Sequence, residues 1–214
     1  MEYFIELLLS GLTRGAIYAL IALGYTMVYG IIGLINFAHG EIYMIGAFTS
    51  FIVATILSIY GFPLLAIIVL AGLAAVIWSA SYGYTIEKIA YKPLRKAPRL
   101  SALISAIGMS IFLQNYVLLA QTSEFLPFPQ LIPDFPFMEP IAHIVGSTDL
   151  VILVTTTIAM LILTVVIKYT KIGKAMRATS QDRTMAMLVG INVDRIISVT
   201  FIIGSSMAAI GGLL

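Results

Sequence analysis

The sequence predicts an all-α protein, a polytopic bundle of about six membrane-spanning helices. Of its 214 residues, 60% are hydrophobic and only 10% are charged, whereas roughly a quarter of the residues are charged in ordinary soluble domains. No charged residue lies between Glu41 and Glu87, and a spanning helix needs about 20 apolar residues. The net charge of +2 gives no support for nucleic-acid binding. The absence of cysteine excludes disulfides, thiol catalysis and Cys-ligated metals.

The apolar segments and the breaks between them define the expected helices, all within one transmembrane domain over residues 1–214. Gly61, Phe62 and Pro63 mark the turn before the third span, and Pro93 and Pro98 stop a helix after it. The expected spans cover residues 8–34, 42–58, 64–86, 101–120, 150–167 and 196–214.

Small residues recur one helical turn apart in the first and last spans. They are Gly11, Gly15 and Ala19 in the first, and Gly204, Ala208 and Gly212 in the last. Such spacing lets a neighbouring helix approach closely. Asp149 is placed to cap the fifth span, because its carboxylate can accept amides of the first turn.

A polar hexapeptide, residues 36–41, separates the first two spans. In one interpretation it is a turn at the membrane surface, with Asn36 capping the next helix. In the other it is a break within the membrane, where free amides and polar side chains line a path. The candidate pathway residues are Asn36, Phe37, His39, Gly40 and Glu41.

Two basic segments predict the orientation. Six of the twelve Lys and Arg residues lie in residues 168–195 and five lie in residues 88–99. Basic residues gather on the cytoplasmic side, so counting back places the N-terminus outside. If residues 36–41 form a re-entrant break, the N-terminus could instead lie inside. The connection over residues 121–149, rich in Pro and Phe and without Lys or Arg, is then an external loop, expected to lie on the membrane as a lid.

The segment at 168–195 has internal order. Asp182 can cap a short helix over residues 183–189, Gly190 suits the left-handed position that ends it, and Asp194 can cap the next helix. This arrangement fits a docking element at the membrane face. An ordinary basic loop is the alternative.

We find no catalytic constellation in the sequence. It has no P-loop glycine pattern, no HExxH and no GxSxG, and the lone His143 has no partner at metal-ligand spacing. ATP-driven transport would therefore need another subunit to hydrolyse ATP. An ion-coupled carrier usually has an intramembrane carboxylate, for which Glu41 is the sole candidate, and a structural membrane protein would show the same hydropathy.

Two groups of motifs resemble the branched-chain amino acid ABC permeases of the LivH type. The first group comprises GLTRGAIYAL (11–20), GYTMVYG (24–30) and INFAHGE (35–41), and the second comprises GKAMRA (173–178), the segment at 181–192, and SSMAAIGG (205–212). The similarity runs through essentially the whole chain. Members of this family are longer, and the chain ends inside an apolar run, so we expect it to be C-terminally incomplete.

The resemblance implies a pore-forming subunit in the cytoplasmic (inner) membrane, without an ATPase site of its own. Its partners would be a second permease subunit, two cytoplasmic ATP-binding subunits and an external solute-binding protein. The implied substrate is a branched-chain amino acid, with urea, short amides or other small polar solutes as alternatives. Residues 168–195 would form the ATPase-coupling loop, in which the implied coupling residues are Gly173, Arg177, Asp182, Ala186, Gly190 and Asn192. The Glu-Ala-Ala pattern of other ABC importers is incomplete here, because Thr184 stands in place of the Glu.

Overall fold

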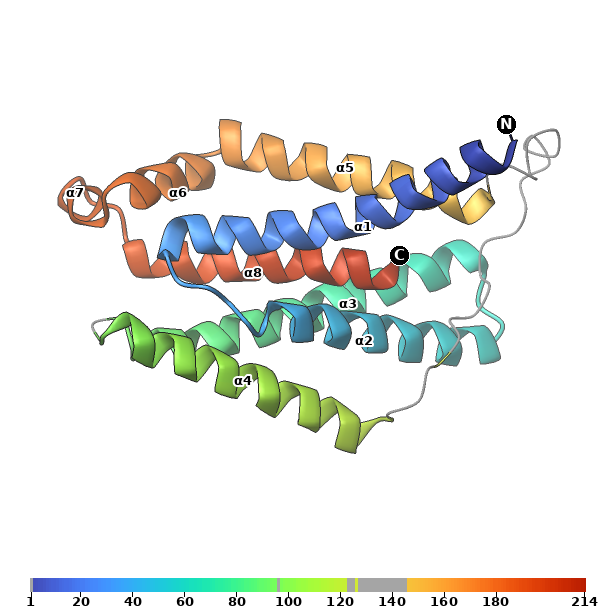
Figure 1. Ribbon diagram of the computed structural model, residues 1–214, viewed down its shortest axis with the longest axis horizontal. Helices are drawn as coiled ribbons and strands as arrows, with labels where there is room; N and C mark the ends of the chain where they lie inside the picture. Colours follow the sequence, from blue (N-terminus) through green and yellow to red (C-terminus); the bar gives the residue numbers. More distant parts are fainter. Residues whose placement is uncertain (1, 96, 123–125, 127–145) are drawn as a thin grey trace.

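The computed structural model describes residues 2–95, 97–122, 126 and 146–214, and within them every regular element is a helix. Most of the expected external loop lies outside the described residues. Six helices are long and apolar enough to cross a membrane, as the sequence predicts. In chain order the helices are α1 (Glu2–Ile32), α2 (His39–Ile59), α3 (Leu64–Ile86), the π-helical turn η1 (Glu87–Tyr91), α4 (Arg99–Ala120), α5 (Ser147–Tyr169), α6 (Lys171–Gln181), α7 (Arg183–Leu188) and α8 (Val193–Leu213) (Figure 1).

Helix α8 is the centre of the bundle. In its most apolar stretch 61% of the residues are buried, against 22–28% in the other five spanning helices. Helix α1 packs on one side of it and α2 and α3 on the other, while α5 lies outside α1 and α4 lies outside α2 (Figure 1). The five outer helices therefore keep apolar faces for lipid or for other subunits.

Small residues allow this central packing. A Cβ atom on Gly24 of α1 would lie 2.7 Å from the carbonyl oxygen of Gly204, and a Cβ atom on Gly212 would lie 2.8 Å from the backbone of α2. The predicted packing face of the last span is thus confirmed. The close contacts pair Gly24 with Gly204, Gly46 with Ala209, Gly83 with Ser205, and Gly212 with Ala47.

The similar pattern at the start of α1 has no close neighbour among the residues that the structure describes. A Cβ atom on Gly11 or Gly15 would meet nothing within 4 Å, and Tyr18 is exposed. This face of α1 is open to lipid or to a second subunit.

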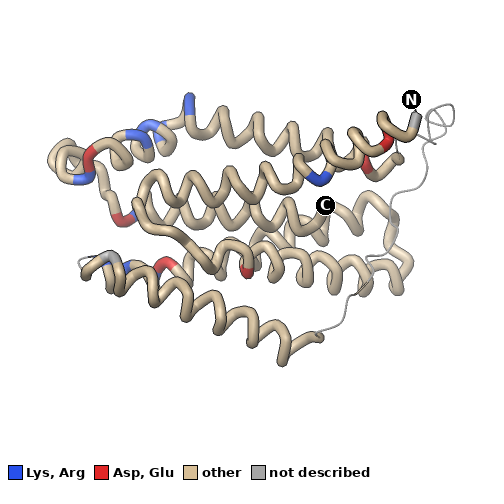
Figure 2. Tube along the Cα trace, viewed as in Figure 1, with Lys and Arg blue, Asp and Glu red and all other residues tan. Residues whose placement is uncertain are grey.

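The basic residues gather at one end of the bundle, which we call the basic end. It carries η1, α6 and α7 (Figure 2). The third spanning helix continues through η1 to Tyr91, beyond its expected end at residue 86. The segment at 168–195 contains two short helices rather than one, because Thr170 caps α6 by accepting a hydrogen bond from the Gly173 amide at 3.0 Å.

Two capping predictions were wrong in detail. Helix α8 begins with Asn192, whose side chain accepts from the Arg195 amide at 3.0 Å, so Asp194 lies in the first turn and is not the cap. Helix α5 begins at Ser147, which places Asp149 in its first turn. There the Asp149 carboxylate accepts from the Gly146 amide at 3.2 Å.

We predict that Gly24→Ala destabilises the protein by about 1–3 kcal/mol, because the added methyl group forces α1 away from α8. Gly15→Ala on the same helix is the control, and it should be neutral or stabilising, because the site is open and Ala is the better helix former. Thermal unfolding of the detergent-solubilised variants measures the difference. Equal midpoints would show that α1 does not depend on this contact.

Candidate functional site

Between α1 and α2 the helical path is interrupted inside the bundle by the non-helical residues 33–38, a segment that we call the break. Helix α1 ends at Ile32, Gly33 adopts a left-handed conformation with φ 66°, and the chain then runs back along α1 (Figure 1). The Nε2 atom of His39, the first residue of α2, lies 3.2 Å from the Ile21 carbonyl oxygen. Ile21 precedes Ile32 by three turns of helix, or about 16 Å. Helix α2 therefore starts deep within the length of α1, as in the second interpretation of the polar hexapeptide.

Asn36 is a buried polar residue of this break, with only 2% of its surface exposed. Its Oδ1 atom accepts a hydrogen bond from the Tyr91 hydroxyl at 3.1 Å. Its Nδ2 atom is buried and has no hydrogen-bond partner. Leaving a buried amide donor unsatisfied costs about 1–3 kcal/mol, so this nitrogen is available to an acceptor that enters the break.

Asn36 does not cap α2, contrary to the surface-turn interpretation. The N-cap residue is Ala38, and no side chain accepts the amides of the first turn. The positive end of the α2 dipole and its amide donors thus face the break without a side-chain partner.

The remaining pathway candidates differ in how far their side chains are buried in the bundle. The buried ring of His39 meets Tyr25 edge-on, with 6.0 Å between ring centroids. Phe37 and Gly40 are exposed. Glu41 is half-buried and accepts a hydrogen bond from the Ser110 hydroxyl of α4 at 2.9 Å.

Helix α7 has the form expected of the segment at 168–195. The Asp182 carboxylate accepts from the amides of Thr184 and Met185 at 2.8 and 3.1 Å, and Gly190 follows in the left-handed region with φ 88°. Both predictions are confirmed. Ala186 is buried against the bundle, and apolar side chains with 56–75% of their surface exposed cover the opposite side. These exposed residues are Met185, Met187, Leu188 and Val189.

Arg183 joins α7 to the break. Its guanidinium donates to the Ile31 carbonyl oxygen at 2.9 Å and also to the Ile32 carbonyl oxygen. These groups end α1 and have no partner within the helix. Burial, and to a smaller extent the positive charge of Arg95, lower the pKa of Arg183 from its ordinary value. A displacement of α7 therefore acts directly on the end of α1, next to Gly33.

A buried carboxylate organises the rest of the basic end. The Glu87 side chain is fully buried and pairs with Arg95, which also pairs with Asp194 of α8. The Ser198 hydroxyl donates to Glu87 Oε2 at 2.8 Å. Glu87 follows the expected end of the third span at residue 86, and the helix continues through it to Tyr91. This network fixes the turn after η1 to the start of α8.

A cavity of about 520 Å³ lies between that turn and α7. Cationic and apolar side chains both contribute to its wall. The lining residues are Arg95, Arg183, Met187, Gly190, Ile191, Asn192, Val193, Asp194 and Ile197.

Comparison with known proteins agrees with this architecture. Residues 7–214 match the family model described as the permease component of the branched-chain amino acid transport system. The chain belongs to this permease family. It is 48% identical over 216 residues to the high-affinity branched-chain amino acid transport system permease protein LivH of Salmonella typhimurium, covering 99% of this chain and 70% of that protein.

Two further relatives extend the comparison of this permease. Identity is 47% to the permease protein BraD of Pseudomonas aeruginosa, again over 99% of this chain and 70% of the relative. It is 27% to a probable LivH of Methanocaldococcus jannaschii, over 91% of this chain and 61% of the relative. No solved structure matches the chain.

In the structure of the permease, the pathway candidates at residues 36–41 and the coupling candidates in residues 168–195 are connected by residues that were not predicted from the sequence. Arg183 and Tyr91 touch the break from α7 and η1, and Glu87 with Arg95 holds the neighbouring turn. A carboxylate beside a 45-residue uncharged stretch, Glu87, was a usable signal. Tyr91 and Arg183 could not be assigned because each acts on carbonyl or amide groups far away in the sequence.

Of the coupling candidates, Gly173 and Arg177 act on α5 rather than on α7. A Cβ atom on Gly173 would lie 2.1 Å from the Ile167 carbonyl oxygen, and the Arg177 guanidinium donates to that same oxygen. Together they close the end of α5 against α6.

We predict that Glu87→Ala and Arg95→Ala each destabilise the permease. Arg95→Ala should cost about 3–5 kcal/mol, because it leaves the fully buried Glu87 carboxylate without its main partner, whereas Arg95 keeps Asp194 in Glu87→Ala. The double variant should cost clearly less than the sum of the two, since the residues share one interaction. Denaturant unfolding in detergent measures the cycle. Strict additivity would mean that the ion pair does not hold this turn.

Proposed function

We propose that this permease is the pore-forming subunit of an ATP-driven importer of branched-chain amino acids in the cytoplasmic membrane. The identity of 48% over nearly the whole chain to permeases of high-affinity branched-chain amino acid transport systems carries the proposal. The six apolar helices and the basic end support it, because Lys and Arg near spanning helices favour the cytoplasmic side. The N-terminus of α1 then lies outside.

The proposed complex contains a second permease subunit, two cytoplasmic ATP-binding subunits and an external solute-binding protein. The exposed apolar side of α7 supports contact with an ATP-binding subunit, since Met185, Met187 and Leu188 are exposed at the basic end, which is the proposed cytoplasmic side. Large exposed apolar patches on water-facing surfaces are typical of protein interfaces. The partners hydrolyse ATP and bias the permease between two packings.

The break between α1 and α2 is the proposed point of contact with the substrate. An amino acid carries a carboxylate, and the uncapped start of α2 together with Asn36 Nδ2 offers donors and positive potential to it. The half-buried Met44 of α2 lines the proposed path of an aliphatic side chain. Arg183 then couples the two sites, because movement of α7 toward or away from its partner shifts the end of α1.

Asn36→Ala should lower uptake of labelled leucine by about tenfold in proteoliposomes containing the assembled importer. The reason is that the substrate loses one hydrogen-bond donor, and such a bond contributes about 1–2 kcal/mol. Asn115→Ala on α4 is the matched control, since that amide is exposed and bonds within its own helix. Normal uptake by Asn36→Ala with intact assembly would remove the break from the pathway.

Arg183→Met should uncouple the importer. We expect the ATPase rate to persist within about twofold while leucine transported per ATP falls by about tenfold, because α7 no longer holds the end of α1. Arg195→Met removes an exposed arginine nearby and should change neither quantity. An unchanged transport-to-ATP ratio in Arg183→Met would contradict this coupling route.

A separate experiment tests the importer assignment itself, independently of the Asn36 and Arg183 variants. Affinity purification of the full-length protein in mild detergent should recover an ATP-binding subunit and ATPase activity. If no such subunit is recovered, the importer assignment is wrong whatever the variants do.

A further inference from the structure

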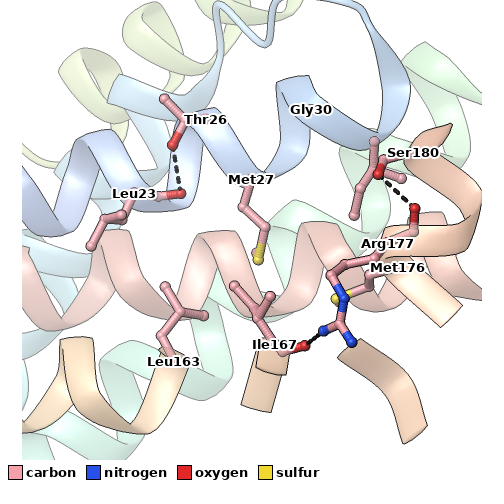
Figure 3. A pocket seen from close by; sticks show the side chains of 10 residues that line it. Leu23, Thr26, Met27, Gly30, Leu163, Ile167, Met176, Arg177 and Ser180 are labelled. Carbon is pink, nitrogen blue, oxygen red and sulfur yellow. Dashed lines mark hydrogen bonds between the residues drawn. The ribbon is translucent and has the colours of Figure 1, made fainter. Parts of the chain in front are cut away.

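A groove with an apolar floor and a cationic rim lies where α1, α5 and α6 meet at the basic end (Figure 3). Its volume is about 290 Å³. The apolar side chains come from α1, α5 and α6, and Arg177 reaches across the rim from α6 to the end of α5 (Figure 3). The lining residues are Leu23, Thr26, Met27, Gly30, Ile31, Leu163, Ile167, Met176, Arg177 and Ser180.

Helix α6 and the end of α5, which border the groove, carry more positive charge than the described residues neutralise. Lys171, Lys174 and Arg177 follow one another at three-residue spacing on α6, which places them on one face of the helix. All three are exposed, as is Lys168 at the end of α5. No Asp or Glu occurs between residues 150 and 181, and no ion pair of these four residues is found among the described residues.

The groove continues into the apolar surface of the spanning helices. Leu23 and Met27 of α1 face Leu163 of α5 across it. Gly30 keeps its upper part open, because a Cβ atom there would meet nothing within 4 Å. The groove thus runs from the apolar surface of the spanning helices to the basic end.

We propose that this groove is a binding site for an anionic phospholipid of the cytoplasmic leaflet. One acyl chain lies along Leu23, Met27 and Leu163, and the headgroup phosphate pairs with Arg177 and Lys174. Basic pockets between spanning helices on the cytoplasmic side are typical sites for such lipids. The inference is independent of the transported substrate. An acidic protein surface would use the same cations but has no need of the apolar floor.

Native mass spectrometry of the purified full-length protein, in its assembled complex, tests the site. The probes are dioleoyl-phosphatidylglycerol and dioleoyl-phosphatidylcholine, titrated in a zwitterionic detergent. Wild type should bind the anionic lipid preferentially. Arg177→Gln with Lys174→Gln should weaken that binding by about fivefold per cation removed. Arg195→Gln, which removes one positive charge elsewhere at the basic end, should have no effect.

Gly30→Leu separates a lipid from other anions. It fills the groove, keeps every charge, and is compatible with the open space at this position. It should abolish the preference for phosphatidylglycerol at least as fully as the charge variants. Equal binding of both lipids by wild type would overturn the proposal. So would anionic-lipid binding that Gly30→Leu leaves unchanged, which would point to surface charge or a protein contact alone.

Discussion

The close approach of three helices to α8 sets the position of everything else in the permease. Gly24 is central to it, because a Cβ atom there would lie 2.7 Å from the Gly204 carbonyl oxygen and 3.2 Å from the His39 ring. The same missing side chain thus lets α1 reach α8 and makes room for the start of α2. Packing without a hydrophobic driving force depends on such small residues in a bilayer, and here it also allows the polar break to lie inside the bundle.

The break leaves backbone groups without helical partners at the end of α1 and at the start of α2, and only those at the end of α1 are hydrogen-bonded by a side chain. The last carbonyl groups of α1 accept hydrogen bonds from Arg183, whereas the first turn of α2 has no side-chain cap. Free backbone groups at membrane depth are tolerated only where protein or water covers them. The satisfied side faces α7, and the unsatisfied side is open to a ligand. The break is therefore attached to the surface segment at one end and free to bind at the other.

The sequence was informative wherever a property repeats or acts locally. The six spans follow from uncharged runs, and α7 follows from Asp182 and Gly190 acting within one turn of chain. Sequence could not choose between a surface turn and an internal break at Asn36, because the choice depends on Tyr91, Ile21 and Gly24. It also missed α6, since that helix is stabilised by burial of Met176 and Thr179 against the bundle rather than by a long apolar run.

The central claim, that α7 and the break move together, can be tested by pulsed electron spin resonance on the assembled importer. The 214 residues contain no cysteine, so spin labels can be placed at Leu188→Cys on α7, Ile35→Cys in the break and Leu119→Cys at the far end of α4, positions that are all exposed. On ATP binding, the distance between residues 188 and 35 should stay constant while both change relative to residue 119. A change in the 188–35 distance, with residue 35 fixed relative to residue 119, would contradict the account.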